Sequence, residues 1–331
     1  MSKKLFSISI LLLILSPAIS FTQEKTSKKI IPRIAVTQTV SSPDFDADAK
    51  GFEKALAEAG FKEGTQVIYD RQNAQGDINR SQAIAQKFLN GNVDLIHSIA
   101  TPSSRAVMKI IKDVPIVFSS VTDPVFAGLI QKTSPLGTKT GTNVTGTSDR
   151  WPVTAQFECY AKFFPKAKKW GTIYNPKDPR SHPYIREMRE AAKRLKVELI
   201  EVTISKEEET LPAVQFLAGK AQTIYITYDH TALSCFDDIV KVCNEKKVPL
   251  FGGDLKSVIK GAMAGYGWDY FQIGYSAGKK AIRILKGDNP GDIPWGLGEK
   301  LLLMINEKAA RAQGAIISPE LLKKADRVIA E

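Results

Sequence analysis

Cysteine and histidine are scarce in this sequence, with only three of each among 331 residues. The cysteines show no Cys-x-x-Cys spacing, and Cys235 and Cys243 would lie about 12 Å apart on one predicted helix, too far for a disulfide. The histidines are widely separated, so their spacing indicates no metal-binding cluster. We therefore expect Cys159, Cys235 and Cys243 to be core thiols, with no disulfide framework, no metal and no cofactor.

Long apolar runs are absent except near the N-terminus. Two lysines there precede an apolar stretch at residues 5–15, and the small residues Ala18 and Ser20 follow. This pattern is typical of a secretory signal peptide cleaved after Ser20, because a membrane span takes about 20 apolar residues. We expect residues 1–20 to be removed and the mature protein to be soluble and periplasmic. An uncleaved signal anchor is the alternative, and no cysteine follows closely enough to indicate a lipid anchor.

Acidic residues are outnumbered, with 35 Asp and Glu against 46 Lys and Arg, so the formal net charge is +11. Such a balance can indicate a nucleic-acid or anionic-membrane partner. Here the basic residues are scattered along predicted helices beside glutamates, as in REMREAAKRLKVE (186–198), and no basic stripe interleaved with aromatic residues occurs. We interpret the charge as a solvated face and expect no nucleic-acid partner.

Familiar catalytic motifs are also missing. The sequence has no GxSxG elbow, no P-loop and no GxGxxG after its first predicted strand. His230 beside Asp229 could serve as an acid or base, but adjacent residues rarely form such a pair and no nucleophile can be assigned to them. We therefore assign no catalytic residue.

Short apolar strands and amphipathic helices alternate from Ile34 onward. Strands are predicted at 33–40, 66–74, 93–100, 114–121, 169–175, 197–204, 222–229, 248–253 and 300–306, and helices at 46–60, 77–89, from Pro102, 153–164, 182–195, 207–218 and 232–246. Helical periodicity vanishes at 138–152, where Gly, Thr and Asn dominate, and the alternation then restarts. The length suits two domains, and strands separated by helices predict right-handed βαβ units and parallel sheets.

Parallel sheets of this kind bind ligands beyond the carboxyl ends of their strands. These ends fall at 39–44, 100–104 and 120–124 in the first half, and at 174–181, 228–231 and 252–254 in the second. All six are rich in Ser, Thr, Asp, Asn, Pro or Gly. They are the expected position of a binding site.

One of these ends, within DLIHSIATPSSRAV (94–107), favours an anion. A helix N-terminus offers unpaired N–H groups and about half a positive charge, so it suits a carboxylate or phosphate. Thr101, Ser103 and Ser104 add hydroxyl donors there, and Pro102 removes no N–H that the helix needs. The alternative is that Thr101 only caps its helix.

Acidic residues follow other strands. Asp123, Asp229 and Asp254 could hold an ammonium group by charge-assisted hydrogen bonds, although each could instead be only an N-cap. Anion donors in one half and carboxylates in the other favour a zwitterion such as an amino acid. Four aromatic residues near these ends could stack on its side chain or could belong to the core: Phe45, Tyr174, Tyr228 and Trp268.

The same segments resemble a known family, the exported substrate-binding proteins of ABC transporters that bind tryptophan or tyrosine. The matching segments are YDRQNAQGD (69–77), LIHSIATPSSRA (95–106), VPIVFSSVTDPVFAGLI (114–130), TNVTGTSD (142–149), VPLFGGD (248–254) and GYGWDYFQIGYSAGKKAIRILKG (265–287). The resemblance extends from about Ile34 to the end of the chain.

The resemblance implies a two-lobed α/β fold, the type I periplasmic-binding-protein fold, with three interlobe crossings. Each lobe is then a mostly parallel sheet flanked by helices. After an N-terminal extension at 21–32, the first lobe comprises 31–147 plus 269–296, and the second comprises 148–268 plus 297–331. Hinge segments near 146–150, 267–270 and 296–300 would close the lobes on a ligand.

Carried over motif by motif, the resemblance implies ligand contacts at Thr101, Ser103, Ser104, Thr122, Asp123, Tyr174, Asn175, Asp229, Thr231 and Asp254. The chain departs from the family pattern after the first strand. Where relatives often carry Glu-His-Pro, it has Ser41-Ser42-Pro43, so Ser41 and Ser42 are further candidates that could alter the preferred head group. His230 also stands where an Asn is common.

We therefore expect a monomeric periplasmic receptor without enzymatic activity. It would bind a small zwitterionic ligand, preferably an aromatic amino acid, and deliver it to an ABC permease in the inner membrane. Two alternatives remain. One is a binding protein that reports ligand to a membrane receptor, and the other is an exported α/β enzyme that uses Asp229 and His230.

Overall fold

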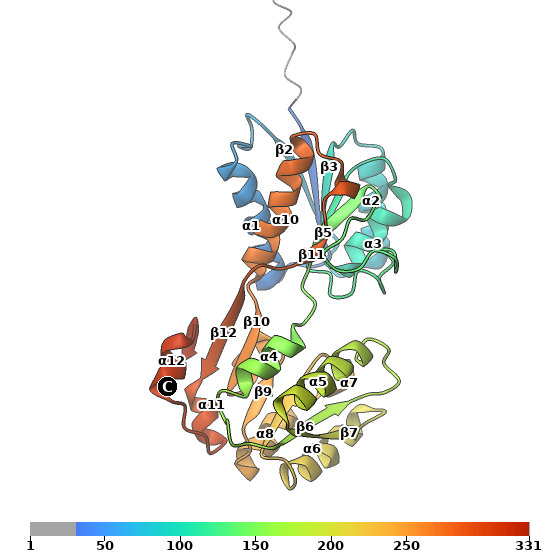
Figure 1. Cartoon of the computed structure of the whole chain (residues 1–331). Helices are drawn as coiled ribbons and strands as arrows, with labels where there is room; N and C mark the ends of the chain where they lie inside the picture. Colours follow the sequence, from blue (N-terminus) through green and yellow to red (C-terminus); the bar gives the residue numbers. More distant parts are fainter. Residues whose placement is uncertain (1–30, 331) are drawn as a thin grey trace, which may run out of the picture. The chain divides into compact units, whose positions relative to one another are not determined.

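Two separate β-sheets organise the described part of the chain, residues 31–330 of the computed structural model (Figure 1). The predicted signal peptide lies outside the described residues, as does all of the predicted N-terminal extension except residues 31 and 32. Among the described helices, none combines the length and the apolar character needed to cross a bilayer.

The first sheet has six strands, all parallel, in the order β11-β5-β4-β3-β1-β2. Its strands are β1 (Arg33–Gln38), β2 (Ile68–Asn73), β3 (Leu95–Ile99), β4 (Ile116–Ser119), β5 (Val144–Ser148) and β11 (Gly296–Leu297). The central strands β3, β4 and β5 are buried along their whole length, as expected for a parallel sheet covered on both faces.

Four helices accompany this sheet: α1 (Pro43–Glu58), α2 (Ile78–Leu89), α3 (Thr101–Ile110) and α10 (Tyr270–Leu285). A short 3₁₀ turn, η2 (Pro290–Asp292), precedes β11. Figure 1 shows α1 and α10 side by side, although they are far apart in the sequence. Gly274 permits this packing, because a Cβ at that position would lie only 1.8 Å from the carbonyl oxygen of Asp48 in α1.

The second sheet has seven strands in the order β13-β12-β10-β9-β8-β6-β7. They are β6 (Lys169–Tyr174), β7 (Glu198–Thr203), β8 (Thr223–Ile226), β9 (Leu250–Gly252), β10 (Ala264–Trp268), β12 (Leu301–Asn306) and β13 (Arg327–Ile329). All neighbouring pairs are parallel except β10 and β12, which run antiparallel.

The helical elements of this part are α4 (Val153–Tyr160), α5 (His182–Leu195), η1 (Glu207–Glu209), α6 (Thr210–Ala218), α7 (His230–Ser234), α8 (Phe236–Lys246), α9 (Leu255–Lys260), α11 (Glu307–Ala312) and α12 (Pro319–Lys324). The core beside α4 is aromatic. Phe251 stacks on Tyr160 with ring centroids 4.4 Å apart, and Phe157 stacks on Trp170 at 4.6 Å. Aromatic pairs add about 0.5–1.5 kcal/mol beyond their area burial, so this cluster anchors α4 to the sheet.

The prediction of an α/β protein with mostly parallel sheets flanked by helices is confirmed. The chain passes between the two sheets three times, after β5, after β10 and after β11. The predicted helix at 232–246 is wrong in one respect, because it is divided at Cys235. The Cys235 N–H bonds to Ala232 only three residues back, so α7 ends in a tight turn, and Ile239 then bonds to the Cys235 carbonyl to start α8. Cys243 is a buried core thiol, as predicted, whereas Cys159 and Cys235 are only partly buried, so the prediction of a core position is wrong for these two.

Candidate ligand-binding site

A cavity of about 480 Å³ is lined by residues that follow strands of both sheets. Pockets that hold small molecules commonly have this size. Its wall includes Ala100, Thr101, Ser120 and Thr122 after strands β3 and β4, Asp149, Trp151, Trp268 and Tyr270 near the passages between the sheets, and Tyr228, His230 and Asp254 after β8 and β9.

The start of α3 forms one part of this wall. Thr101 is the first helical residue, and the capping position is Ala100, which makes no side-chain cap. The interpretation that Thr101 only caps its helix is therefore wrong. Ala100 has φ of 71°, in the left-handed region that non-glycine residues rarely adopt. This conformation turns the chain sharply from strand into helix and leaves Thr101 on the cavity wall.

The other two hydroxyls of the Thr-Pro-Ser-Ser turn are used inside the protein. Ser103 Oγ lies 3.0 Å from Thr39 Oγ1, and the Ser103 N–H donates to the same oxygen. Ser104 Oγ lies 2.9 Å from Ser98 Oγ and donates to the Ala100 carbonyl. Both serines are buried and do not line the cavity, so Ser104 fixes α3 against β3 and Ser103 fixes it against the segment after β1.

A buried polar network supports the wall after β4. Ser120, with φ of 52°, donates its hydroxyl to the buried carboxylate of Asp48, and Ser119 donates to the other oxygen at 2.8 Å. His97 Nε2 lies 2.8 Å from Ser119 Oγ, and its ring stacks on Phe52 at 3.9 Å. Because these groups bond to one another, they hold the backbone at Ser120 in its unusual conformation.

Asp149, directly after β5, is the most unusual acid in the cavity. It is 4% exposed and accepts a hydrogen bond of 2.9 Å from the Tyr270 hydroxyl at Oδ2. Its Oδ1 makes no hydrogen bond to the described residues. The pKa of Asp149 is raised to about 6, mainly by burial and to a small extent by the Asp48 charge, while the hydroxyls of Tyr270 and Thr122 offset part of the rise.

Aromatic rings cover much of the remaining wall. Tyr228 meets Trp151 edge to face with centroids 5.2 Å apart, and the Trp268 indole N–H donates to the Arg150 carbonyl at 2.9 Å. A Cβ on Gly253 would lie 2.1 Å from the Trp151 ring, so only glycine allows the ring to sit there.

Phe45 from α1 adds another ring, 6.4 Å from that of Tyr270. Of the four aromatic residues singled out from the sequence, Phe45, Tyr228 and Trp268 line the cavity. Tyr174 does not, and its hydroxyl accepts a hydrogen bond from Arg189.

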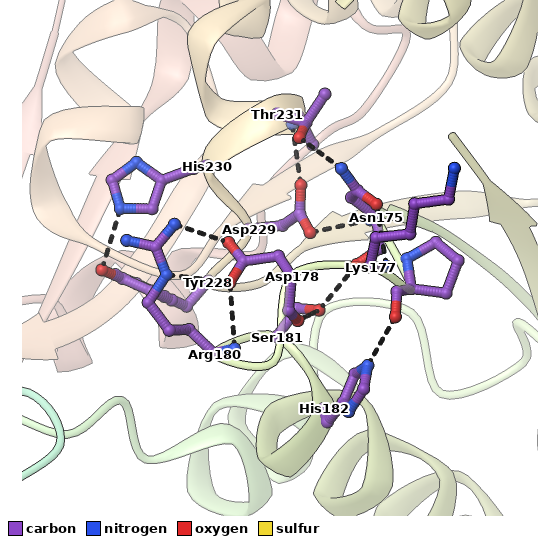
Figure 2. Close-up of polar contacts among 12 residues, drawn as sticks. Asn175, Lys177, Asp178, Arg180, Ser181, His182, Tyr228, Asp229, His230 and Thr231 are labelled. Atoms are coloured by element: carbon purple, nitrogen blue, oxygen red, sulfur yellow. Dashed lines mark hydrogen bonds and ion pairs between the residues drawn. The ribbon is translucent and has the colours of Figure 1, made fainter. Parts of the chain in front are cut away.

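The predicted polar residues after β6 and β8 bond to one another (Figure 2). Asp229 accepts from the backbone N–H of Asn175 at 2.8 Å and from that of Ala232 at 2.9 Å, and Asn175 Nδ2 donates to Thr231 Oγ1. Burial raises the pKa of Asp229, and these backbone donors partly offset the rise. None of the three predicted residues lines the cavity. They join the loop before α5 to the start of α7.

His230 does line the cavity, and Figure 2 shows it directed at Tyr228, with Nε2 3.2 Å from the phenol oxygen. Both oxygens of the neighbouring Asp229 accept backbone N–H groups instead. The two residues therefore do not form an acid–base pair with each other. In the described part of the chain, no cluster of three or more His, Cys, Asp or Glu residues could hold a metal ion.

One ion pair joins elements associated with different sheets at the cavity. Lys256 Nζ in α9 lies 2.5 Å from Asp44 Oδ2 in the first turn of α1, and both residues line the cavity. Asp254 caps α9 by accepting from the Ser257 N–H at 2.6 Å while also lining the cavity.

Three further candidates lie off the cavity wall. Ser42 caps α1 through the Phe45 N–H, Ser41 donates to Asp46, and Asp123 accepts from the Phe126 N–H in a turn.

The chain matches the family described as ABC transporter substrate binding protein over residues 33–329. It belongs to this family. It is also 38% identical over 289 residues to a tyrosine-binding protein of Clostridioides difficile strain R20291. The aligned region covers 87% of this chain and 83% of that protein.

Two solved structures share its fold. A ligand-free, open structure of a substrate-binding protein with adhesive properties from Clostridium difficile is 34% identical, with a TM-score of 0.82, over 91% of this chain and 100% of the other. An ABC domain from Streptococcus pneumonia in complex with L-Trp is 29% identical, with a TM-score of 0.70, over 90% and 99%. The predicted family and fold are confirmed.

For this ABC substrate-binding protein, three of the predicted contact residues line the cavity: Thr101, Thr122 and Asp254. Asp149, Trp151 and Tyr270 also line it but were not among the predicted ligand contacts. Asp149 ends the TNVTGTSD segment, which resembles the family but was not predicted to be a strand. Treating β5 as one more strand end would have identified it.

Proposed function

We propose that this protein is the exported solute-binding component of an ABC importer and that it captures a zwitterionic ligand, preferably an aromatic amino acid. The observation that carries the proposal is the composition of the cavity wall. It combines five aromatic side chains with the N-terminus of helix α3, which favours an anion, and with carboxylates, which favour a cation. Pockets of this kind orient a ligand by a few polar contacts and bury its apolar part against rings.

Each part of an aromatic amino acid has a counterpart in this cavity. The start of α3, where Thr101 lies on the wall, suits the carboxylate because a helix N-terminus favours negative charge. Acidic groups suit the ammonium, and Trp151 and Trp268 suit the ring. The tyrosine-binding relative and the L-Trp complex support this ligand class.

Capture would occur by hinge closure of two lobes, 31–147 plus 269–296 and 148–268 plus 297–331. The three passages between the sheets support this proposal, because a chain that crosses near 146–150, 267–270 and 296–300 can bend at a few residues. The family supports delivery to a membrane permease. We further propose export through the signal peptide at 1–20, a periplasmic location and a monomeric receptor without catalytic activity.

A thermal-shift screen of residues 21–331 tests the ligand class. Tyrosine, tryptophan and phenylalanine would be compared with sugars, purines and small carboxylates. At 100 times its dissociation constant, a ligand that binds only the folded state raises the free energy of unfolding by about 2.7 kcal/mol. A shift produced only by compounds that are not amino acids would contradict the proposed ligand. Consumption of a bound compound, followed by mass spectrometry, would instead favour an enzyme.

A further inference from the structure

We propose that the carboxylate of Asp149 binds the ammonium group of the ligand, so that the cavity selects amines over otherwise identical molecules without one. This inference rests on the proposed function and names the side chain that recognises one end of the ligand. It assigns that role to Asp149 in place of Asp229, Asp254 and Asp123.

The hydrogen bonds of Asp149 leave one oxygen available. Tyr270 holds Oδ2 at 2.9 Å, whereas Oδ1 makes no hydrogen bond to the described residues. The side chain is buried and lies on the cavity wall. A buried acceptor without a donor is costly, and an ammonium group at this position would supply both a donor and an opposite charge.

In the described part of the chain, Asp149 forms no ion pair with a lysine, arginine or histidine. Among the described residues that line the cavity, Lys256 is the single lysine or arginine, and it pairs with Asp44. The nearby Arg150 directs its guanidinium to Glu187 at 2.7 Å. Burial raises the pKa of Asp149, in agreement with an ionised carboxylate that has one oxygen without a donor. A ligand cation would remove that deficit.

The competing acids are engaged by backbone groups. Asp229 accepts two N–H groups, and Asp254 and Asp123 each accept one at the start of a helix or turn. Asp254 and Asp123 each keep a second oxygen, but both residues are partly exposed, so water can solvate that oxygen, whereas the open oxygen of Asp149 is buried. Asp149 is only 4% exposed, and a charge pair is stronger at a buried position than in water.

Isothermal titration calorimetry with matched ligands tests the assignment. The probes are tyrosine and its deamino analogue 3-(4-hydroxyphenyl)propionate, with tryptophan and indole-3-propionate as a second pair. Wild type should prefer each amino acid. Asp149→Asn should weaken the affinity for the amino acids about 100-fold, as expected when one partner of a buried charge pair is lost. The affinity for the deamino analogues should change by less than about threefold.

Two further variants make the result specific. Tyr270→Phe removes the hydroxyl that orients Asp149 and should weaken the affinity for the amino acids about tenfold. The variant should still bind each amino acid more tightly than its deamino analogue. Asp77→Asn removes the same charge at the exposed cap of α2, where Asn caps equally well, and should leave both ligand classes unchanged. Circular dichroism confirms that each variant is folded.

The outcomes separate the two proposals. If Asp149→Asn retains the preference for amino acids, or if Asp254→Asn alone abolishes it, the assignment of the ammonium to Asp149 is overturned while the amino-acid receptor stands. If wild type binds neither the amino acids nor the corresponding amines, tyramine and tryptamine, both proposals are overturned.

Discussion

Replacing Asp149 with Asn should stabilise the ligand-free protein at neutral pH. In the folded state its pKa is about 6, whereas the ordinary value is 3.8, so the folded protein binds this proton more tightly than the unfolded chain. Keeping Asp149 ionised above pH 6 therefore costs about 3 kcal/mol of folding free energy. Asn accepts the Tyr270 hydroxyl equally well, but its amide N–H groups also need partners. We therefore expect a net gain of about 1–3 kcal/mol.

The sign of the pH dependence provides the sharper measurement. Because the folded state holds the proton more tightly, wild type should lose this stability as pH rises from about 4 to 6, and the loss should level off above that range. The variant lacks the group and should show no such loss. The difference between variant and wild type should therefore be small at pH 4 and largest at pH 7, as measured by urea unfolding of ligand-free protein.

Asp254→Asn is the matched control for this prediction. It also lies on the cavity wall and caps α9, and Asn caps helices as well as Asp does. Its stability at pH 7 should stay within about 0.5 kcal/mol of wild type. A stability gain for Asp149→Asn that does not vary with pH, or a loss at pH 7, would refute the argument that an uncompensated buried charge is present.

Three other substitutions test the rest of the cavity. Lys256→Ala removes the ion pair with Asp44 and should change the free energy of unfolding by less than about 1 kcal/mol. In stopped-flow measurements the ligand should dissociate a few times faster, and an unchanged off-rate would exclude a role for the pair in retaining ligand. Gly253→Ala places a methyl group against the Trp151 ring and should lower the free energy of unfolding by about 1–3 kcal/mol. The loss would appear as a lower unfolding midpoint and altered tryptophan fluorescence, and a fluorescence spectrum identical to that of wild type would contradict the packing. His230→Ala should weaken binding by about tenfold at most, since His230 contacts Tyr228 and not Asp229, whereas the loss of a measurable turnover would favour an enzyme.

The elements of this fold could be predicted from local sequence signals. Asp77 caps α2 as expected, and α5 spans His182–Leu195, the range given by its periodicity. The buried strands are short apolar runs bounded by polar residues, and this pattern needs no knowledge of distant contacts. The division of α7 from α8 at Cys235 was not predictable, because an apolar periodicity continues through a single tight turn.

The candidate site was predictable only in position. The carboxyl ends of the strands do contribute the cavity wall, but residue type did not show which side chains reach it. Ser103 and Ser104 have the same hydroxyl chemistry as Thr101, yet both bond to β3 or to the segment after β1. The direction of each side chain depends on the turn at Ala100, whose left-handed conformation is not indicated by an alanine in the sequence.

The acids show a rule that the sequence does contain. Asp229 and Asp254 stand immediately before a helix, where the first N–H groups need an acceptor, and each is a cap in the structure. Asp149 also follows a strand, but α4 begins only at Val153 and is preceded by Pro152, which has no N–H to offer. Asp123, after β4, accepts an N–H from the turn that follows it. An acid that ends a strand with neither a helix nor a turn directly after it lacks such a donor. Such an acid, here Asp149, is the one left free to bind a cation, and for this reason its substitution should separate amine recognition from folding.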